Sequence, residues 1–420
     1  MIKRIREIFS NRSARTLINN FFSLSSMQLV GMLLPLVTLP YILRVLGFEK
    51  YGIIVLASSL VAYFQSVTDF SFKITATRDV AKFRGNPRKL NLIYSRVLTV
   101  KLILLLFSFS IITTVVFLYA PFWDDRLIFF LSMPLLLGHA LFPDWFFQGI
   151  EKMKYISFLD IGIKLFFTCC IFIFVKKPGD FWIYPLLYSG SYIMAGFIGQ
   201  LILVRNFNLR FIWLKQARIK NVLLDNYPVF VNQFVPTLYN NSTTFLLGIF
   251  GTSIMVGNYA AIKRIVDLAV RLLSIVSRVF FPLLNRNRDA FVRYRQLVLS
   301  VSIALCLLIL LSSKLIFWYL NIDYSNAVYV LLVLVIGIIG YSVYDIYGLN
   351  YFIVRREDKL VMSNTLKVSF AGFLLAFPLV YYFGILGAAI NLSLARILLG
   401  GGIYYKYHFR KLNPLKSIKV

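Results

Sequence analysis

Four charged residues recur within one apolar stretch, residues 256–281. They are Arg264, Asp267, Arg271 and Arg278, spaced by three, four and seven residues. On a helix this spacing places all four along one face. Each such charge costs about 2.5–3.5 kcal/mol at the centre of a bilayer, so the charges must face water, a partner charge or a bound anion. A helix lined with cations inside a membrane predicts an anion pathway.

The composition predicts an all-α polytopic membrane protein. Of 420 residues, 59% are hydrophobic and only 17 are Asp or Glu, which is too apolar for a soluble globular chain. Runs of about 20 apolar residues predict twelve transmembrane helices. The predicted spans are 19–43, 51–72, 98–120, 127–148, 156–175, 182–204, 224–250, 256–281, 297–313, 326–349, 360–382 and 386–405.

The basic residues are distributed unevenly between the predicted loops. Of the 45 Lys and Arg residues, 31 lie in the two tails and the even-numbered loops, and six lie in the odd-numbered loops. The positive-inside rule therefore predicts cytoplasmic termini and extracytoplasmic odd loops. Topology and anionic lipid account for the net charge of +28, and no separate basic domain is left to bind nucleic acid.

A weak internal symmetry is visible when the chain is cut near residue 222. Residues 46–52 (LGFEKYG) join the first two spans, and residues 250–257 (FGTSIMVG) join the seventh and eighth spans about 205 residues later. We expect two six-helix lobes, residues 1–222 and 223–420. Parallel repeats of this kind place a substrate site in a central cleft between the halves.

The second half supplies most of the cations inside predicted spans. Lys367 and Arg396 join Arg264 and Arg271 as candidates to hold an anion, whereas Arg278 is close enough to its span end to reach the interface. Uncharged hydrogen-bonding groups on one face of the seventh span predict a cavity wall. These are Gln233, Thr237, Asn240 and Asn241, in a span interrupted by Pro228 and Pro236.

Two deep acids are candidates for coupling transport to an ion. Asp69 in the second span and Asp345 in the tenth have no cation at helical spacing except Lys73, four residues after Asp69. The chain has only two histidines, so a coupled proton or cation would use a carboxylate.

Two other acids have cations at helical spacing. Asp267 lies three and four residues from Arg264 and Arg271, where it is either an internal counter-ion or a proton site. Asp160 and Lys164 are four residues apart, a spacing at which an acid and a base neutralise each other on one helix.

Nothing in the sequence indicates an enzyme, a metal site or a cofactor. No catalytic triad, nucleotide loop or metal-ligand spacing stands out, and the predicted loops are too short for an enzyme domain. His139 and Asp144 form an H-x4-D string used by some acyltransferases, but both lie inside the fourth span, so we interpret it as coincidence. The sequence predicts a transporter.

Three strings in the first half are distinctive. Residues 142–155 (FPDWFFQGIEKMKY) closely resemble the end of the fourth span of bacterial O-antigen flippases of the Wzx type. Residues 68–81 (TDFSFKITATRDVA) resemble the second span and following loop of that family, and residues 39–47 (LPYILRVLG) resemble its first span. The family belongs to the multidrug, oligosaccharidyl-lipid and polysaccharide exporter superfamily. The resemblance implies a two-lobed transporter of twelve spans with a central V-shaped cavity.

The resemblance also implies the substrate. An undecaprenyl-diphosphate-linked oligosaccharide, the repeat unit of an O-antigen or similar surface glycan, is expected to be moved from the cytoplasmic to the periplasmic leaflet of the bacterial inner membrane by alternating access. The candidate cations would hold the diphosphate, the Asn and Gln groups would contact sugars, and the polyprenyl tail would stay among membrane lipids. Proton or cation antiport would reset the carrier, and other membrane proteins of glycan assembly are the expected protein partners.

Three alternatives stay open. A membrane-embedded glycan polymerase or ligase would also handle lipid-linked sugars, but such enzymes resemble chains with a large extracytoplasmic loop. A drug or cation exporter of the same superfamily would favour an acidic cavity. In a structural scaffold without transport, charges within spans would only pair with each other or snorkel to the interface. The predicted spans contain eight cations but only five acids, and this excess of cations argues against a scaffold.

Overall fold

Capping residues determine where the long helices begin. The computed structural model describes residues 12–212, 214 and 216–412. Helix α4 (Pro87–Leu118) follows Asn86, whose side chain accepts a hydrogen bond from the Lys89 amide at 3.1 Å. Its first residue, Pro87, occupies the turn that needs no intrahelical N–H donor. Thr252 caps α12 (Ser253–Arg286) in the same way, through the amide of Met255 at 3.3 Å.

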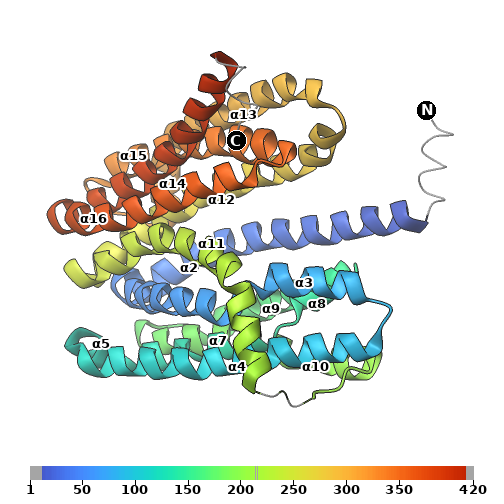
Figure 1. Cartoon of the computed structure of the whole chain (residues 1–420). Helices are drawn as coiled ribbons and strands as arrows, with labels where there is room; N and C mark the ends of the chain where they lie inside the picture. Colours follow the sequence, from blue (N-terminus) through green and yellow to red (C-terminus); the bar gives the residue numbers. More distant parts are fainter. Residues whose placement is uncertain (1–11, 213, 215, 413–420) are drawn as a thin grey trace. The chain divides into compact units, whose positions relative to one another are not determined.

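The described residues form helices and contain no strand (Figure 1). They belong to two compact units, the first made of residues 1–41 and 60–234 and the second of residues 42–59 and 235–420. Helices α2 (Arg12–Asp69) and α11 (Gln216–Phe250) contribute to both units. The other helices of the first unit are α3 (Phe72–Phe83), α4, α5 (Ala120–Asp124), α6 (Arg126–Ser132), α7 (Pro134–Leu141), α8 (Asp144–Gly149), α9 (Met153–Phe174), η1 (Pro178–Trp182) and α10 (Ile183–Phe207). Those of the second unit are α12, η2 (Arg288–Ala290), α13 (Phe291–Leu311), α14 (Ser313–Leu320), α15 (Ala327–Val343), the π-helix η3 (Tyr344–Phe352), η4 (Ile353–Arg355) and α16 (Asp358–Leu412).

Single glycines divide the two longest helices. Gly47 inside α2 has φ 75° and ψ 169°, and Gly384 inside α16 has φ 52° and ψ −126°. Positive φ is accessible to glycine without steric cost, so each helix consists of two helical segments that meet at its glycine. These segments correspond to the predicted pairs of spans at each end of the chain.

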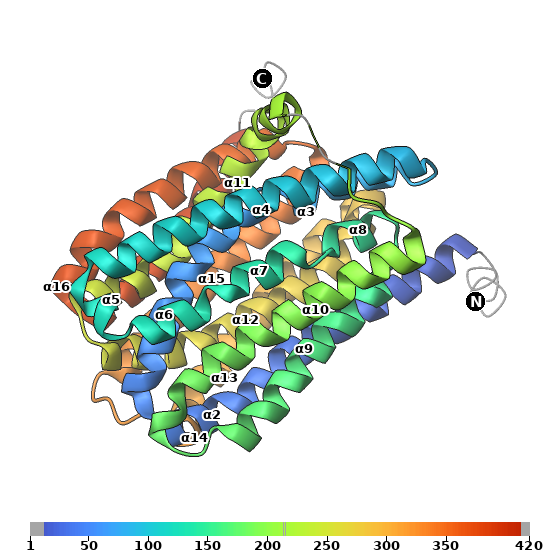
Figure 2. The same ribbon diagram turned by 90° about the horizontal axis from the view of Figure 1, so that it is seen from below.

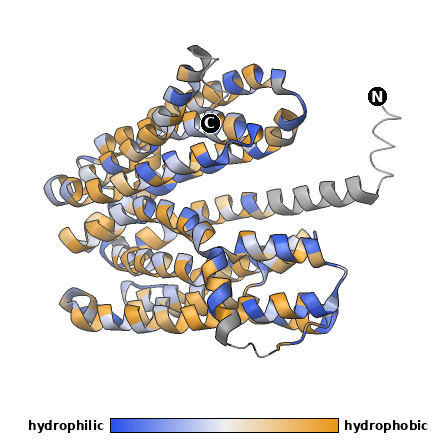
Figure 3. Ribbon diagram, viewed as in Figure 1, coloured by the Kyte–Doolittle hydropathy of each residue, from blue (hydrophilic) through white to orange (hydrophobic). Residues whose placement is uncertain are grey.

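The predicted fold class, an all-α polytopic membrane protein, is confirmed. Within the described residues, eight segments are long and apolar enough to cross a membrane, and two of these contain the kinked helices α2 and α16. Figure 3 shows apolar residues along the helices of each unit and hydrophilic residues gathered where α3 leads into α4. The exact count of twelve, the lobe boundary at residue 222 and the V-shaped cavity stay predictions. So does the cytoplasmic location of the termini, since residues 1–11 and 413–420 lie outside the described chain.

The two turns that suggested an internal repeat pack against each other within the second unit. A Cβ on Gly52 would lie 1.7 Å from the carbonyl oxygen of Ser253, and a Cβ on Gly257 would lie 2.2 Å from that of Phe48. The two approaches are reciprocal, because Phe48 and Ser253, like Gly52 and Gly257, are 205 residues apart. Repeats related by a two-fold axis produce such paired contacts.

A second glycine pattern recurs once in each unit. In the first unit α7 lies beside α10 (Figure 2), where a Cβ on Gly196 would lie 2.9 Å from the Gly138 carbonyl oxygen. In the second unit α15 meets α16, where a Cβ on Gly400 would lie 2.3 Å from the Gly340 carbonyl oxygen. Small residues let helix backbones approach closely inside membranes. The same packing in both units agrees with the internal repeat.

Candidate functional site

Helix α12 carries the charged stripe, and its acid is held by two cations. Asp267 accepts from Lys263 on the same helix at 3.0 Å and from Arg396 on α16 at 2.9 Å. Helical spacing suggested Arg264 and Arg271 as neighbours of Asp267 and did not identify Lys263 or Arg396 as its partners. Lys263 lies one turn earlier at the favourable i, i+4 spacing, while Arg396 is distant in sequence and became a neighbour only through packing of α16.

Arg396 is therefore part of a buried ion pair. It is 5% exposed, and its Nη1 atom has no hydrogen-bond partner within the described ranges. A buried guanidinium is tolerated because a carboxylate neutralises it, and removing that carboxylate would leave an uncompensated charge. Arg396 thus fixes α16 against α12, and one of its nitrogens stays available for a further acceptor.

The three remaining cations of the stripe differ in their surroundings. Arg264 is half-buried and forms no ion pair with any described residue. Arg271 is exposed. Arg278 is exposed and donates to the Ser274 hydroxyl on its own helix at 3.4 Å. Arg264 is therefore a stripe cation that no described acid neutralises.

The other predicted binding residues are distributed over both units. Lys367 on α16 is exposed in the second unit. Asn240 and Asn241 on α11 are half-buried there, and the Asn240 amide donates to the Pro236 carbonyl at 3.1 Å. Gln233, on the same helix, is exposed and belongs to the first unit. Their role in binding stays a prediction.

Asp345 lies in a buried cluster of oxygen atoms. It is fully buried in the π-helix η3, and Tyr294 donates to its Oδ2 at 2.6 Å. The amide of Asn350 donates to Tyr294 at 2.8 Å and to the Ser277 hydroxyl at 2.7 Å. No Lys or Arg of the described chain pairs with Asp345, and its Oδ1 has no hydrogen-bond partner there. A buried carboxyl without a cation is the arrangement expected for a proton or small cation site.

Asp69 has a partner that helical spacing did not reveal. Lys101 on α4 donates to Asp69 Oδ1 at 2.8 Å and to the His139 carbonyl at 3.4 Å, and it is 2% exposed. Gln65, one turn before Asp69, contacts the His139 ring at 3.2 Å. Among the described acids, Asp69 is thus neutralised by a buried cation and Asp345 is not.

The strings that suggested the family contact each other in the first unit. Lys73 on α3 lies 3.2 Å from Asp144 on α8, and the Thr77 hydroxyl donates to the Trp145 carbonyl at 3.1 Å. The predicted Asp160–Lys164 ion pair on α9 is also confirmed. In the H-x4-D string, the His139 ring contacts Gln65 and Asp144 pairs with Lys73, so the two side chains have separate partners. Across residues 12–212, 214 and 216–412, no group of three His, Cys, Asp or Glu residues is placed to hold a metal.

A family model described as "Polysaccharide biosynthesis protein" matches residues 17–288. The chain belongs to this family. It is 28% identical over 391 residues to a protein of Escherichia coli (strain K12) named "Putative O-antigen transporter", covering 91% of this chain and 94% of the relative. A protein of the same name from Shigella dysenteriae is 24% identical over 376 residues, covering 87% and 94%.

Solved structures show the same fold. The lipid II flippase MurJ, in an inward closed conformation, matches with a TM-score of 0.66 and 14% identity, covering 93% of this chain and 87% of that chain. An inward-facing multidrug resistance MATE family transporter matches with a TM-score of 0.61 and 13% identity, covering 94% and 100%. The family model and the two relatives confirm the resemblance to O-antigen flippases of the Wzx type, and the solved structures share the fold. The family member described here is a bacterial multi-pass membrane transporter and not an enzyme.

Proposed function

We propose that this transporter flips an undecaprenyl-diphosphate-linked oligosaccharide from the cytoplasmic to the periplasmic leaflet of the inner membrane. One observation carries the proposal: on α12 the half-buried Arg264 forms no ion pair with any described residue, so a guanidinium remains three residues from the neutralised Asp267. A diphosphate is an anion that guanidinium groups bind through charge-assisted hydrogen bonds. The names of the relatives supply the glycan class.

The assigned roles follow the chemistry of each group. Arg264 and Arg271 hold the diphosphate, with Lys367 and the unpartnered nitrogen of Arg396 as further donors. Asn240, Asn241 and Gln233 supply amides that hydrogen-bond sugar hydroxyls. The polyprenyl tail needs no protein site because membrane lipid solvates it. Alternation between two accessible states then moves the headgroup across the bilayer.

Deletion of the gene in its host tests this function. We expect lipid-linked repeat units to accumulate, unpolymerised, on the cytoplasmic leaflet, and surface glycan to be lost. Leaflet location is measured by the access of a membrane-impermeant glycosidase or lectin to inverted and right-side-out vesicles. Plasmid-borne wild-type protein is the control and restores export. Unchanged surface glycan in the deletion strain would contradict the proposal.

We assign coupling to Asp345, which binds and releases a proton during the cycle. Its carboxyl is the described membrane acid that is both fully buried and without a cation, whereas Asp69 pairs with Lys101 and Asp267 pairs with Lys263 and Arg396. The neighbouring hydroxyl of Tyr294 and amide of Asn350 hold it in place in either protonation state. If the proton binds one conformational state more tightly than the other, its binding drives the return of the empty transporter to its starting state.

Replacing Asp345 with Asn tests the coupling. The substitution keeps the size and an acceptor for Tyr294, so we expect a folded protein whose transport in vesicles no longer responds to an imposed proton gradient. Tyr294→Phe is the matched control, because it removes the contact but keeps the acid and should keep the response. If Asp345→Asn keeps its response to the proton gradient, the coupling residue lies elsewhere. If transport by the wild-type protein responds to a sodium gradient and not to a proton gradient, sodium is the coupled ion.

A further inference from the structure

A cavity of about 180 Å³ lies inside the first unit, where α3, α4 and the beginning of α11 meet. None of its lining residues belongs to the transport site proposed above. Phe72, Thr75 and Ala76 of α3 and Val97 of α4 line its apolar part. The start of α11 packs on the apolar core of this unit through Ile219, Val222 and Leu223, so the cavity is part of the folded unit.

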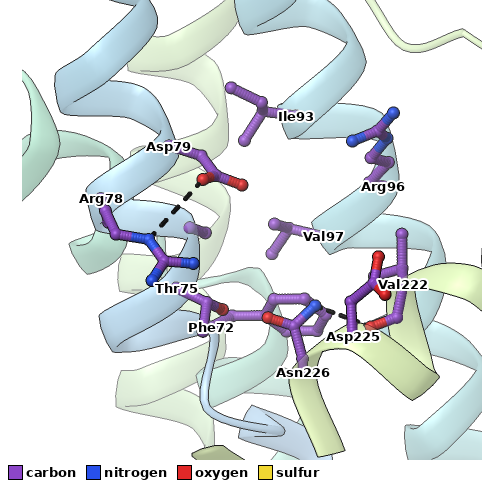
Figure 4. A pocket seen from close by; sticks show the side chains of 11 residues that line it. Phe72, Thr75, Arg78, Asp79, Ile93, Arg96, Val97, Val222, Asp225 and Asn226 are labelled. Carbon is purple, nitrogen blue, oxygen red and sulfur yellow. Dashed lines mark hydrogen bonds and ion pairs between the residues drawn. The ribbon is translucent and has the colours of Figure 1, made fainter.

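Two cations and two acids complete the lining. Figure 4 shows Arg78 and Asp79 on one side of the pocket, and Arg96, Asp225 and Asn226 coming from the other two helices. The charged residues are scarcely paired with one another. Arg78 and Asp79 lie 4.0 Å apart, and neither Arg96 nor Asp225 forms an ion pair within the described part of the chain.

Arg96 is the member of this group that most needs a ligand. Its Nε atom is buried and has no hydrogen-bond partner among the described residues. An unsatisfied buried donor is costly, and more so on a charged group. A guanidinium directs several donors in one plane and matches the oxygens of a phosphate. The opposing carboxylates of Asp79 and Asp225 balance its charge, so the pocket is suited to a ligand with both signs.

We propose that this pocket binds the phosphoethanolamine headgroup of a zwitterionic membrane phospholipid. Arg96 and Arg78 receive the phosphate, and Asp225 and Asp79 accept hydrogen bonds from the ammonium. The volume is below the roughly 300–1,000 Å³ of pockets for drug-sized ligands and suits a small headgroup.

The position of the pocket agrees with a lipid ligand. It lies near the chain segments 73–97 and 205–223, which the positive-inside rule places on the cytoplasmic side. Large apolar side chains next to lining residues are exposed, with Ile74 51% and Leu224 62% accessible. Such side chains offer acyl chains a surface outside the pocket. The proposal is independent of the transported substrate.

Lipid titrations of the purified full-length protein in detergent test the pocket. Phosphatidylethanolamine is expected to raise the melting temperature at concentrations about tenfold lower than phosphatidylglycerol or phosphatidylcholine. Phosphatidylglycerol has no ammonium group, and the quaternary ammonium of phosphatidylcholine has no N–H to donate. Arg96→Gln and Asp225→Asn should remove this preference, and Arg96→Lys should restore part of it. Arg88→Gln is the control, because Arg88 is exposed on the same helix and does not line the pocket.

Each contrary result has a definite meaning. Equal stabilisation by the three lipids, or a phosphatidylethanolamine preference that survives Arg96→Gln, overturns the proposal. Soluble O-phosphoethanolamine separates the two sources of this headgroup: if it stabilises as tightly as the lipid, the ligand is a free metabolite and the assignment to lipid is wrong. The Arg96 Nε atom has no partner among the described residues and Arg96 forms no ion pair there, so the melting temperature of Arg96→Gln without lipid should match the wild type.

Discussion

The double variant Arg264→Gln and Arg271→Gln is expected to insert into the membrane normally and to export glycan at no more than about a tenth of the wild-type rate. Each charge-assisted hydrogen bond to a phosphate is worth roughly 1.5–3 kcal/mol, and about 1.4 kcal/mol changes an equilibrium tenfold. Removing cations from a membrane helix also eases insertion. Surface glycan in the deletion strain, normalised to the amount of protein in the membrane, measures the effect.

Arg278→Gln is the matched control for this experiment. It makes the same chemical change on the same helix, at an exposed residue that donates to Ser274 on its own helix. We expect export near the wild-type level. Full export by the double variant would assign the stripe to structure and would leave the diphosphate without its main proposed ligands. Equal losses in all variants would indicate a general requirement for positive charge on α12.

The sequence predicts the helices correctly where hydrophobic periodicity and the positions of Gly and Pro indicate the same boundaries. The predicted span 156–175 is α9 at Met153–Phe174, and the predicted turns at Gly47 and Gly384 are where α2 and α16 break. The predicted span 127–148 is the membrane-length segment Arg126–Gly149, but it is divided into three short helices, α6, α7 and α8. Pro134 and Pro143 at these breaks were visible in the sequence and limit helix continuity.

Contacts between helices explain what the sequence missed. Spacing along one helix identified Asp160–Lys164, but it did not identify Lys263 and Arg396 as partners of Asp267, or Lys101 as the partner of Asp69. Lys101 is 32 residues from Asp69 and Arg396 is 129 residues from Asp267. Which distant helices adjoin is decided by packing, which periodicity does not encode.

The isolation of Asp345 is the clearest example of this limit. Its sequence neighbours suggested an acid without a cation, and that expectation held, but Tyr294 and Asn350 as its partners depend on the π-helix η3. A π-helix changes the register of side chains relative to an α-helix and is frequent at functional sites. Hydrophobic periodicity does not predict one.

Gly52→Ala is expected to destabilise the folded protein by about 1–3 kcal/mol, the usual cost of overpacking. An added Cβ would lie 1.7 Å from the Ser253 carbonyl oxygen, which is backbone and cannot rotate away. The melting temperature of the purified protein in detergent should fall. Gly401→Ala is the control, because nothing lies within 4 Å of its Cβ position and Ala favours the helix. A Gly52→Ala protein that melts like wild type would show that residues 48–52 and 253–257 are not in close contact.

The reciprocal geometry makes a stronger prediction for the double variant Gly52→Ala and Gly257→Ala. A Cβ on Gly52 would also lie 3.0 Å from the Gly257 amide nitrogen, so both substitutions act on one backbone crossing. Once the first methyl group has forced the segments apart, the second finds more room, and the double variant should cost less than the sum of the single ones. Strictly additive losses would mean that the two glycines relieve separate clashes. Because the two contacts relate residues 205 apart, similar single-variant losses would support a common origin of the two turns in an internal repeat.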